Sequence, residues 1–226
     1  MRMRKKKNLI PRMERCERLL IKDPYIMPGK WRDLYPETNQ PRDINPESGD
    51  KRRELRLEIG CGKGGFTAET AKLNPDILLI GLEVVPEAIV VAMERCMDLN
   101  PSNAYFIRAD AGQLDQFFAP DEIDCIYLNF SDPWPGNRHA KRRLTHGNFL
   151  KIYRQILKSG GKIQFKTDNQ PLFEFSLTEL PKYGFELSDI TWNLHEHGVS
   201  DIMTDYEAKF YQQGLPICRL IGTMRE

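Results

Sequence analysis

The stretch Leu55-Arg-Leu-Glu-Ile-Gly-Cys-Gly-Lys-Gly-Gly-Phe66 decides the fold of this chain. Its first five residues form an apolar run that suits a buried strand. The glycines that follow permit positive φ angles and a close approach of the backbone to a ligand. Residues 65–73 then suit a helix. A strand, a glycine-rich turn and a helix in this order indicate a ligand-binding α/β unit.

The same alternation continues along the chain. Apolar runs that suit buried strands alternate with stretches that suit helices, which predicts parallel strands joined by right-handed crossovers. Two late runs lack a helical crossover of comparable length and suit an antiparallel hairpin at the sheet edge. We therefore expect an α/β fold, with a mostly parallel seven-stranded sheet, an antiparallel edge hairpin and helices on both faces. The expected strands cover residues 55–59, 77–82, 104–107, 123–128, 162–165, 185–194 and 216–223, and the expected helices cover 65–73, 86–99, 144–158 and 171–180, with Gly160-Gly161 ending the third helix.

Two regions of the 226-residue chain differ in composition. Residues 1–54 are polar, show little periodicity and contain prolines at positions 11, 24, 28, 36, 41 and 46. We expect them to form a partly flexible N-terminal arm with one short helix near residues 12–21 and a loop through residue 50. Residues 55–226 are long enough for a single domain.

The composition excludes several classes of protein. The five cysteines are scattered without a CxxC pair, which favours a reducing compartment over a disulfide framework or a zinc cluster. His195-x-His197 is only a weak metal signal, so we expect no metal. No apolar run approaches the roughly 20 residues of a membrane span, and no long apolar segment follows the basic start as in a secretory signal. We expect a cytoplasmic protein without a membrane partner.

Acidic residues stand at or just behind the end of each expected parallel strand. In an open α/β sheet, ligands bind outside the carboxyl ends of the strands. Like charges gathered at one edge are costly unless a cationic or hydrogen-bond-donating group lies among them. The acids are Glu58, Glu83, Asp110, Asp132 and Asp168.

Two cofactors compete for this edge. Gly60, Gly62 and Gly65 satisfy G-x-G-x-x-G, so a dinucleotide must be considered. Glu83 suits the ribose hydroxyls of either cofactor, and we expect Asp110-Ala111 to contact adenine. The acids would repel a pyrophosphate but attract the sulfonium and ammonium groups of S-adenosylmethionine, which is therefore the cofactor we expect.

A second informative stretch, Asn129-Phe-Ser-Asp-Pro-Trp-Pro135, follows the fourth expected strand. Its acid, Asp132, lies between Ser131 and Pro133. A basic cluster follows in a chain whose net charge is only +1, and a local patch of this kind can steer a polyanion. An acidic turn beside a basic patch indicates chemistry on a nucleic acid. The cluster consists of Arg138, His139, Lys141, Arg142 and Arg143.

These residues resemble the bacterial tRNA (guanine-N7-)-methyltransferases. The glycine-rich turn is common to many methyltransferases, but three strings are specific and occur in the family's order. They are Phe130-Ser-Asp-Pro-Trp-Pro135, Arg138-His-Ala-Lys-Arg-Arg143 and Thr204-Asp-Tyr-Glu-Ala-Lys-Phe210. The resemblance implies a Rossmann-like class I methyltransferase that transfers a methyl group from S-adenosylmethionine to N7 of a guanine, at position 46 in the variable loop of tRNA.

The resemblance also implies roles for individual residues. Gly136 departs from the family, which usually has lysine there, and Arg138 or Lys141 are the candidates to replace that cation. The implied cofactor contacts are Glu58, Gly60, Gly62, Glu83, Asp110, Ala111, Asn129 and Asp132; the guanosine contacts are Asp168, Thr204, Tyr206 and Glu207; the RNA contacts are Arg138, His139, Lys141, Arg142 and Arg143.

Guanine N7 carries a lone pair and no proton, so its methylation needs no general base. Catalysis would be alignment plus electrostatics, with Asp132 stabilising the purine as it becomes cationic. Glu207 or Asp168 could clamp the N1–H and N2–H₂ donors of guanine. Because N7 lies in the deep major groove of an RNA helix, the target must be unstacked, and Trp134 or Tyr206 could stack on it.

Three alternatives stay open at this level. One is a methyltransferase that acts on another RNA base, and one is a non-catalytic tRNA-binding relative, which the missing lysine at Gly136 mildly favours. An NAD-dependent dehydrogenase ranks last. The sequence leaves open whether the protein is a monomer or a homodimer.

Overall fold

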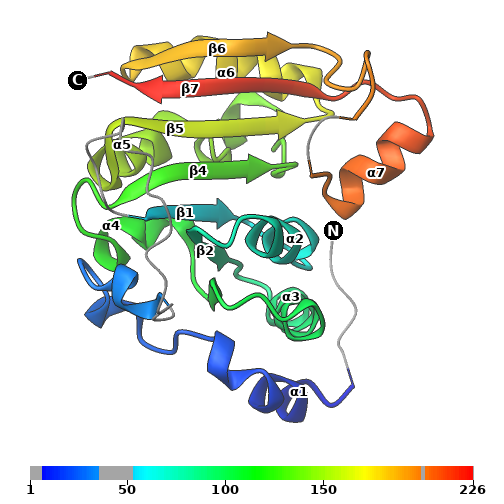
Figure 1. The fold of residues 1–226 in the computed structure, drawn as a ribbon. Helices are drawn as coiled ribbons and strands as arrows, with labels where there is room; N and C mark the ends of the chain where they lie inside the picture. The colour runs from blue at the N-terminus through cyan, green and yellow to red at the C-terminus, as the bar shows by residue number, and fades with distance from the viewer. Residues whose placement is uncertain (1–6, 36–52, 200–201, 226) are drawn as a thin grey trace.

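The computed structural model describes residues 7–35, 53–199 and 202–225, and its centre is one twisted sheet (Figure 1). Seven strands lie in the order β3-β2-β1-β4-β5-β7-β6. β7 pairs antiparallel with both β5 and β6, whereas β1 to β5 pair with one another in parallel. The expected fold class is confirmed. The strands are β1 Glu54–Ile59, β2 Ile77–Leu82, β3 Ala104–Ile107, β4 Ile123–Asn129, β5 Leu157–Thr167, β6 Phe185–Thr191 and β7 Cys218–Met224.

Helices cover both faces of the sheet, and the burial pattern of β2 shows why. Ile77 and Leu79 join a core with α2 and α3, whereas Leu78, Ile80 and Leu82 join a second core with α4, α5 and α6. Successive side chains of a strand point to opposite faces, so a strand buried on both faces is apolar throughout. The helices are α1 Leu9–Arg15, α2 Gly65–Leu73, α3 Pro86–Leu99, α4 Leu114–Phe117, α5 Gly147–Ile156, α6 Gln170–Lys182 and α7 Asp205–Gln212.

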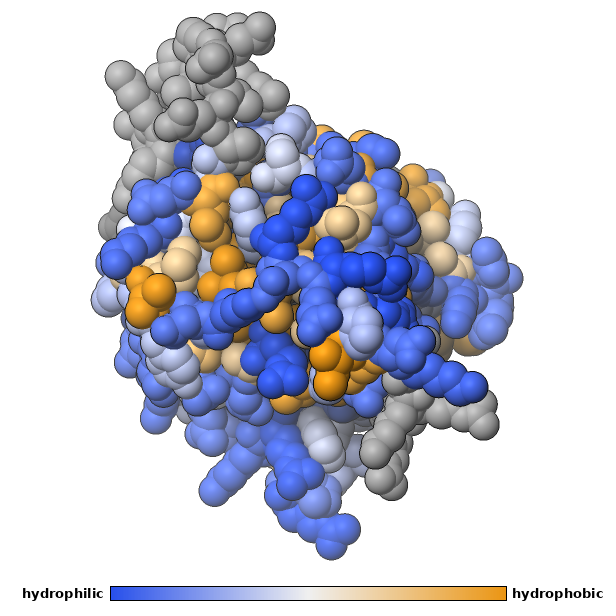
Figure 2. All heavy atoms as spheres, turned by 90° about the horizontal axis from the view of Figure 1, so that it is seen from below, coloured by the Kyte–Doolittle hydropathy of each residue, from blue (hydrophilic) through white to orange (hydrophobic). Residues whose placement is uncertain are grey.

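Part of the N-terminal region packs onto the domain. Trp31 is fully buried, stacks on Phe118 at 4.9 Å and donates from Nε1 to the carbonyl of Phe117 at 2.8 Å. Leu20 bridges to Phe106 of β3. Figure 2 shows the molecule from below the view of Figure 1. This face is mostly hydrophilic, with apolar side chains in separate groups. Leu20 and Ile21 thus lie against the β3 edge, while α1 packs against α3. The expected loop through residue 50 lies outside the described residues. The domain division at residue 54 stays a prediction.

Several boundaries differ from the sequence predictions. β6 covers Phe185–Thr191 instead of 185–194, β7 covers Cys218–Met224 instead of 216–223, and α6 covers Gln170–Lys182 instead of 171–180. The differences at the N-terminal helix, at α5 and at the start of β5 are larger. The N-terminal helix is α1, which starts and ends earlier than residues 12–21. α5 is shorter than 144–158, and Gly160-Gly161 lies inside β5 instead of ending the helix. The reason is a register shift, in which Ile123 pairs with Leu157 but Cys125 pairs with Lys162. Gly160, at φ +71°, is in the extra segment that bulges from β5. The segment between β6 and β7 holds α7, which was not predicted.

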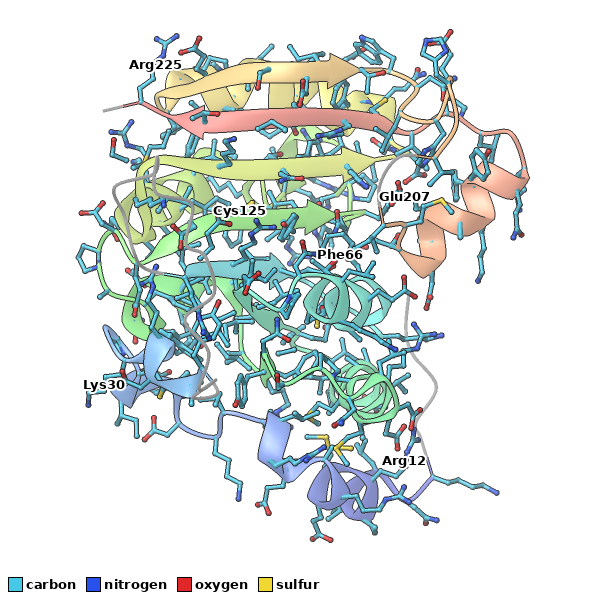
Figure 3. All side chains as sticks on the ribbon, viewed as in Figure 1. Arg12, Lys30, Phe66, Cys125, Glu207 and Arg225 are labelled. Carbon is cyan, nitrogen blue, oxygen red and sulfur yellow. The ribbon has the colours of Figure 1, made fainter. Side chains whose placement is uncertain are left out.

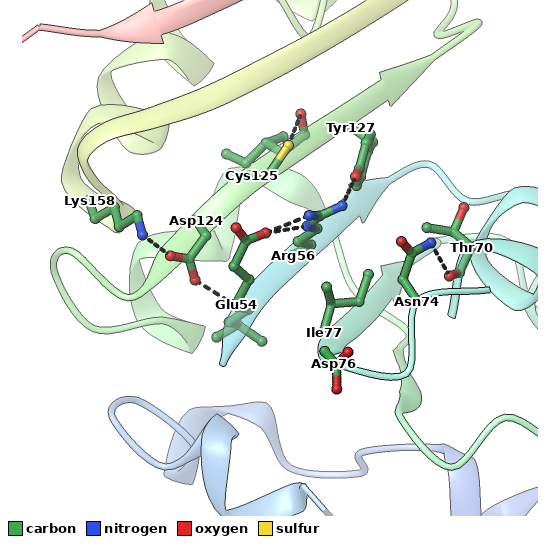
Figure 4. Close-up of polar contacts among 12 residues, drawn as sticks. Glu54, Arg56, Thr70, Asn74, Asp76, Ile77, Asp124, Cys125, Tyr127 and Lys158 are labelled. Carbon is green, nitrogen blue, oxygen red and sulfur yellow. Dashed lines mark hydrogen bonds and ion pairs between the residues drawn. The ribbon is translucent and has the colours of Figure 1, made fainter. Parts of the chain in front are cut away.

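The amino ends of the strands are closed by local polar contacts. Asp124 of β4 accepts from the backbone N–H of Leu55 at 2.7 Å and pairs with Arg32 at 2.9 Å and with Lys158. Arg56 of β1 donates to Glu54 at 2.7 Å and to the hydroxyl of Tyr127 at 2.8 Å (Figure 4). Because these groups satisfy one another, this end of the sheet is structural, and the functional residues gather at the opposite end.

Candidate active site

A cavity of about 1060 Å³ opens at the carboxyl ends of β1 to β4. Its wall combines the glycine turn, the segments that follow β2 and β3, the Ser131–Trp134 turn and the basic segment behind it. Three of the predicted acids, Glu83, Asp110 and Asp132, line it together with Gly60, Gly62, Ala111, Lys141 and Arg142. The structure therefore brings most of the predicted cofactor residues to one cavity.

Glu83 holds the glycine turn in shape. Its Oε2 accepts from the N–H of Gly62 at 3.0 Å, and its Oε1 accepts from the N–H of Val85 at 2.9 Å. Gly62 has φ +57°, a conformation that glycine adopts readily. At Gly64, a Cβ atom would lie 2.5 Å from the Cβ of Ala92, so glycine is required where α2 crosses α3. Each Glu83 oxygen keeps a lone pair for a ligand.

Asp110 and Ala111 form the wall after β3. Asp110 Oδ1 caps the following turn by accepting from the N–H of Gly112 at 2.7 Å. The rest of its carboxylate is exposed at the cavity, next to the buried Ala111. This leaves one acceptor and one small apolar surface side by side, as a purine with an exocyclic amino group requires.

The turn that carries Asp132 is fixed from both ends. Phe130 and Trp134 have positive φ angles, +52° and +41°, which non-glycine residues rarely adopt. Phe130 N donates to the carbonyl of Lys166 at 2.9 Å. Arg143 donates to the carbonyls of Pro133 at 3.1 Å and Trp134 at 3.2 Å. Backbone strain of this kind persists only where the surroundings impose it, often at functional sites.

Glu58 lies behind the cavity and does not line it. Its side chain is buried, and it accepts from the Thr67 hydroxyl and from Asn129 Nδ2 at 3.0 Å. Burial raises the pKa of Glu58 to about 7, although the two hydrogen bonds oppose this shift. Asn129 is likewise absent from the cavity wall. A direct contact of Glu58 or Asn129 with the cofactor stays a prediction.

The four predicted guanosine residues lie between β5 and α7. Asp168 follows β5, and burial together with the Asp168 charge raises the pKa of Tyr206. The Tyr206 ring lies 5.1 Å from that of Phe130, which lines the cavity. Thr204 caps α7. Glu207 is completely buried, and its carboxylate contacts Lys166 and His195. Neither Asp168 nor Tyr206 is among the residues that line the cavity, so their contact with a substrate stays a prediction. Glu207 lies on the side of α7 that faces the sheet (Figure 3).

The predicted RNA-contacting residues divide into two groups. Arg138, Lys141 and Arg142 are exposed on the short 3₁₀ helix Asn137–Arg142, where the partly exposed His139 also lies. The Arg142 guanidinium lies 4.7 Å from the centre of the Trp134 ring. Arg143, in contrast, turns inward and lies 4.5 Å over the Phe175 ring. It supports the turn that carries Asp132.

Within residues 7–35, 53–199 and 202–225, no group of three His, Cys, Asp or Glu side chains could hold a metal ion. No helix in this part of the chain is long and apolar enough to cross a membrane. Thr67 and Lys166, which contact Glu58 and Glu207, received no role from the sequence. A threonine in a helix and a lysine in a strand carry no pattern that marks them, because only the folded chain brings them to Glu58 and Glu207.

Comparison with known proteins agrees with this geometry. Residues 52–220 match the family model described as "Putative methyltransferase". The tRNA (guanine-N(7)-)-methyltransferase of Geobacillus kaustophilus is 42% identical over 220 residues, which cover 97% of this chain and 95% of that protein. That of Lachnoclostridium phytofermentans is 41% identical over 205 residues, 90% and 89% of the two chains. The crystal structure of the 16S rRNA methyltransferase KamB has a TM-score of 0.58 at 14% identity, covering 78% of this chain and 90% of that one. The chain belongs to the tRNA (guanine-N(7)-)-methyltransferase family.

Proposed function

We propose that this protein transfers the methyl group of S-adenosylmethionine to N7 of a guanine in the variable loop of tRNA. The observation that carries the proposal is the position of Asp132. It lies on a strained turn that forms part of the cavity wall, the acids Glu83 and Asp110 line the same cavity, and the exposed cations of residues 138–142 follow this turn in the chain. The two bacterial relatives described above are tRNA (guanine-N(7)-)-methyltransferases.

The hydrogen-bonding groups of the cavity suit the cofactor. Glu83 would accept the ribose hydroxyls, and Asp110 with Ala111 would face adenine. Ser131 Oγ is buried on the cavity wall, and among the described residues it has no hydrogen-bond partner. Buried polar atoms normally have a partner, so this hydroxyl is free to bind a polar group of the ligand. When bound, S-adenosylmethionine supplies a methyl group on a positively charged sulfur.

The chemistry requires alignment and charge stabilisation from the protein. The lone pair of N7 forms the new N–CH₃ bond while the S–CH₃ bond breaks, and its electron pair stays on sulfur. The positive charge thus moves to the purine and no proton is lost. The carboxylate of Asp132, held by Pro133, would stabilise that charge as it develops. The prebuilt turn would keep this arrangement with little reorganisation.

Guanine recognition is assigned to Asp168. Its carboxylate offers two acceptors for the N1–H and N2–H₂ donors of guanine, which adenine lacks in that pattern. The half-exposed Tyr206 would stack on the extruded base. Thr204 would shape this part of the site as the cap of α7. Glu207 is the weaker candidate for the clamp because its carboxylate already has partners.

tRNA would bind through the exposed cations next to the cavity. Arg138, Lys141 and Arg142, with His139, would contact phosphates, and they follow directly on the Asp132 turn. With Gly136 in place of a lysine, Arg138 or Lys141 would supply the cation beside the target. A tRNA substrate fits the expected cytoplasmic location.

The test is methyl transfer from radiolabelled S-adenosylmethionine to unmodified tRNA, followed by complete digestion to nucleosides. We expect the label in 7-methylguanosine, mapped to the variable loop. Label in another nucleoside would identify a methyltransferase with a different target base. tRNA binding without any transfer would identify a non-catalytic relative, and either result would contradict the proposal.

A further inference from the structure

The most enclosed charged group near the site is the carboxylate of Glu207, on the inner side of α7 (Figure 3). Its side chain is 0% exposed. Lys166 Nζ lies 3.1 Å from Oε1 and 3.3 Å from Oε2, and His195 Nε2 lies 2.9 Å from Oε1. The side chains of Lys166 and His195 are each only 6% exposed. The three residues come from β5, from the turn after β6 and from α7.

These contacts occupy the carboxylate of Glu207. Besides Lys166 and His195, the backbone N–H of Thr204 donates to Oε2 at 3.2 Å. An ionised carboxylate has about four lone-pair sites, and four contacts are made here. A guanine that presented N1–H and N2–H₂ would have to displace Lys166 or His195. Direct recognition of the base by Glu207 would therefore leave a buried cation or a buried N–H without a partner, which is costly.

The same contacts fix the start of α7. Glu207 N donates to Thr204 Oγ1 at 3.0 Å, which completes a capping box. One residue earlier, Tyr206 meets Phe130 of the cavity wall at 5.1 Å between ring centres. On the outer side, Asp205 pairs with Arg95 of α3 at 2.6 Å. The position of Tyr206 beside Phe130 thus depends on how firmly α7 is held against the end of β5.

We propose that Lys166, His195 and Glu207 are positioning residues that hold α7 against β5, and that Glu207 does not touch guanine. Their network keeps Tyr206 beside Phe130 and Asp168, where the target base would enter. The inference rests on the proposed function, because it names which residues of that site act through others.

A double-mutant cycle between Lys166 and Glu207 tests the inference. Lys166→Met leaves the Glu207 charge buried without its cation, and Glu207→Gln leaves the Lys166 charge without its anion. We expect each single variant to lose at least tenfold in kcat/KM for tRNA. The double variant removes both charges, while the glutamine amide oxygen that replaces the carboxylate can still accept from the Thr204 N–H, so we expect it to regain most of the activity. Lys162→Met, on the same face of β5 but exposed, is the matched control and should keep wild-type activity.

His195 gives an independent check. The acceptor Oε1 requires Nε2 to be the donor, and the amide of a glutamine can donate in its place. We expect His195→Gln to keep kcat/KM for tRNA within about threefold, and His195→Leu to lower it at least tenfold. The dissociation constant of S-adenosylmethionine should stay within twofold in every variant, because none of the three residues lines the cofactor cavity.

If Glu207 clamps the base directly, Glu207→Gln will lower kcat/KM for tRNA by the same factor whether position 166 holds Lys or Met. The double variant will then be less active than either single variant. That result overturns the inference. Amide hydrogen exchange in α7, measured without substrate, separates it from the proposed function. If exchange in α7 is faster in Lys166→Met and returns to the wild-type rate in the double variant, the anchoring of α7 is supported even if the wild type methylates another base. If exchange in α7 is unchanged in Lys166→Met, the inference is contradicted.

Discussion

Asn129, the last residue of β4, donates from Nδ2 to the buried Glu58 of β1 at 3.0 Å. This bond ties the two central strands together immediately before the turn that carries Asp132. The same Glu58 carboxylate accepts from Thr67 of α2, so one buried acid connects the sheet, the helix after the glycine turn and the start of the Asp132 turn. The acid lies behind the cavity and supports it.

Glu58 makes the stability of the fold depend on pH. Burial raises its pKa to about 7 in the folded protein, against about 4.3 in an unfolded chain. The folded state therefore binds the proton of this carboxyl more tightly than the unfolded chain does. The stabilisation that this proton gives the fold is complete below about pH 4.3 and is lost as the pH rises to about 7. At about 1.4 kcal/mol per pKa unit, we expect this carboxyl to contribute a decrease of roughly 3 kcal/mol over that range.

Urea unfolding at pH 5 and pH 7.5 measures this decrease. Glu58→Gln keeps the shape of the side chain and cannot ionise. The variant should therefore lose less unfolding free energy than the wild type when the pH rises from 5 to 7.5. Glu69→Gln, an exposed site on α2, serves as the control. Equal pH dependence in wild type and Glu58→Gln would show that Glu58 titrates normally.

Asp132→Asn tests the electrostatic role of the turn. The amide has nearly the same shape but no charge, so we expect kcat to fall about 100-fold, as when one group that stabilises transition-state charge is removed. Asp132 is exposed on the cavity wall, so the thermal unfolding temperature of the variant should change little. Single-turnover methyl transfer measures the effect, and near-normal turnover would refute the role.

Arg143 and the exposed cations are expected to respond differently to alanine substitution. Arg143→Ala removes two hydrogen bonds to the carbonyls of Pro133 and Trp134, and we expect a loss of roughly 2 kcal/mol in unfolding free energy. Arg138→Ala with Lys141→Ala should leave stability unchanged and reduce the slope of log affinity for tRNA against log salt by about one unit per cation. A stable Arg143→Ala protein with a reduced slope would instead place Arg143 on phosphate.

Gly136 is required by its backbone. It has φ +84° and ψ +147°, a region open almost only to glycine, although a Cβ atom at this position would meet no other atom within 4 Å. We expect Gly136→Ala to destabilise the protein by about 1–3 kcal/mol in thermal or urea unfolding. Gly136→Lys should carry the same cost, so restoring the family's lysine would not simply improve tRNA binding. An unchanged stability in Gly136→Ala would show that the turn adapts.

Periodicity and glycine placement were enough to predict the sheet. The runs 77–82 and 104–107 are apolar on both faces, and strands β2 and β3 have those bounds. Local sequence did not predict where β5 begins, because the bulge at Gly160 follows from pairing with β4, a contact distant in sequence. α7 was missed although Thr204 and Glu207 form a capping box, since its apolar face is short.

The acids were predicted to share one edge, and three of them line one cavity. Their separate tasks could not be predicted, because a carboxylate's role depends on burial and partners. Glu58, Glu83 and Glu207 are all glutamates in the sequence. In the structure, Glu58 and Glu207 are enclosed by hydrogen-bond donors from distant segments. Lys166 and His195 became visible as a pair only through the fold.

The central claim is that N7 of a guanine in tRNA attacks the methyl group, and replacing that one atom tests it most directly. A tRNA with 7-deazaguanine at the target position keeps the N1–H and N2–H₂ donors and has a C–H in place of N7. We expect it to bind with the affinity of the unmodified tRNA and to accept no methyl group. Methyl transfer to this tRNA at the wild-type rate would contradict the account.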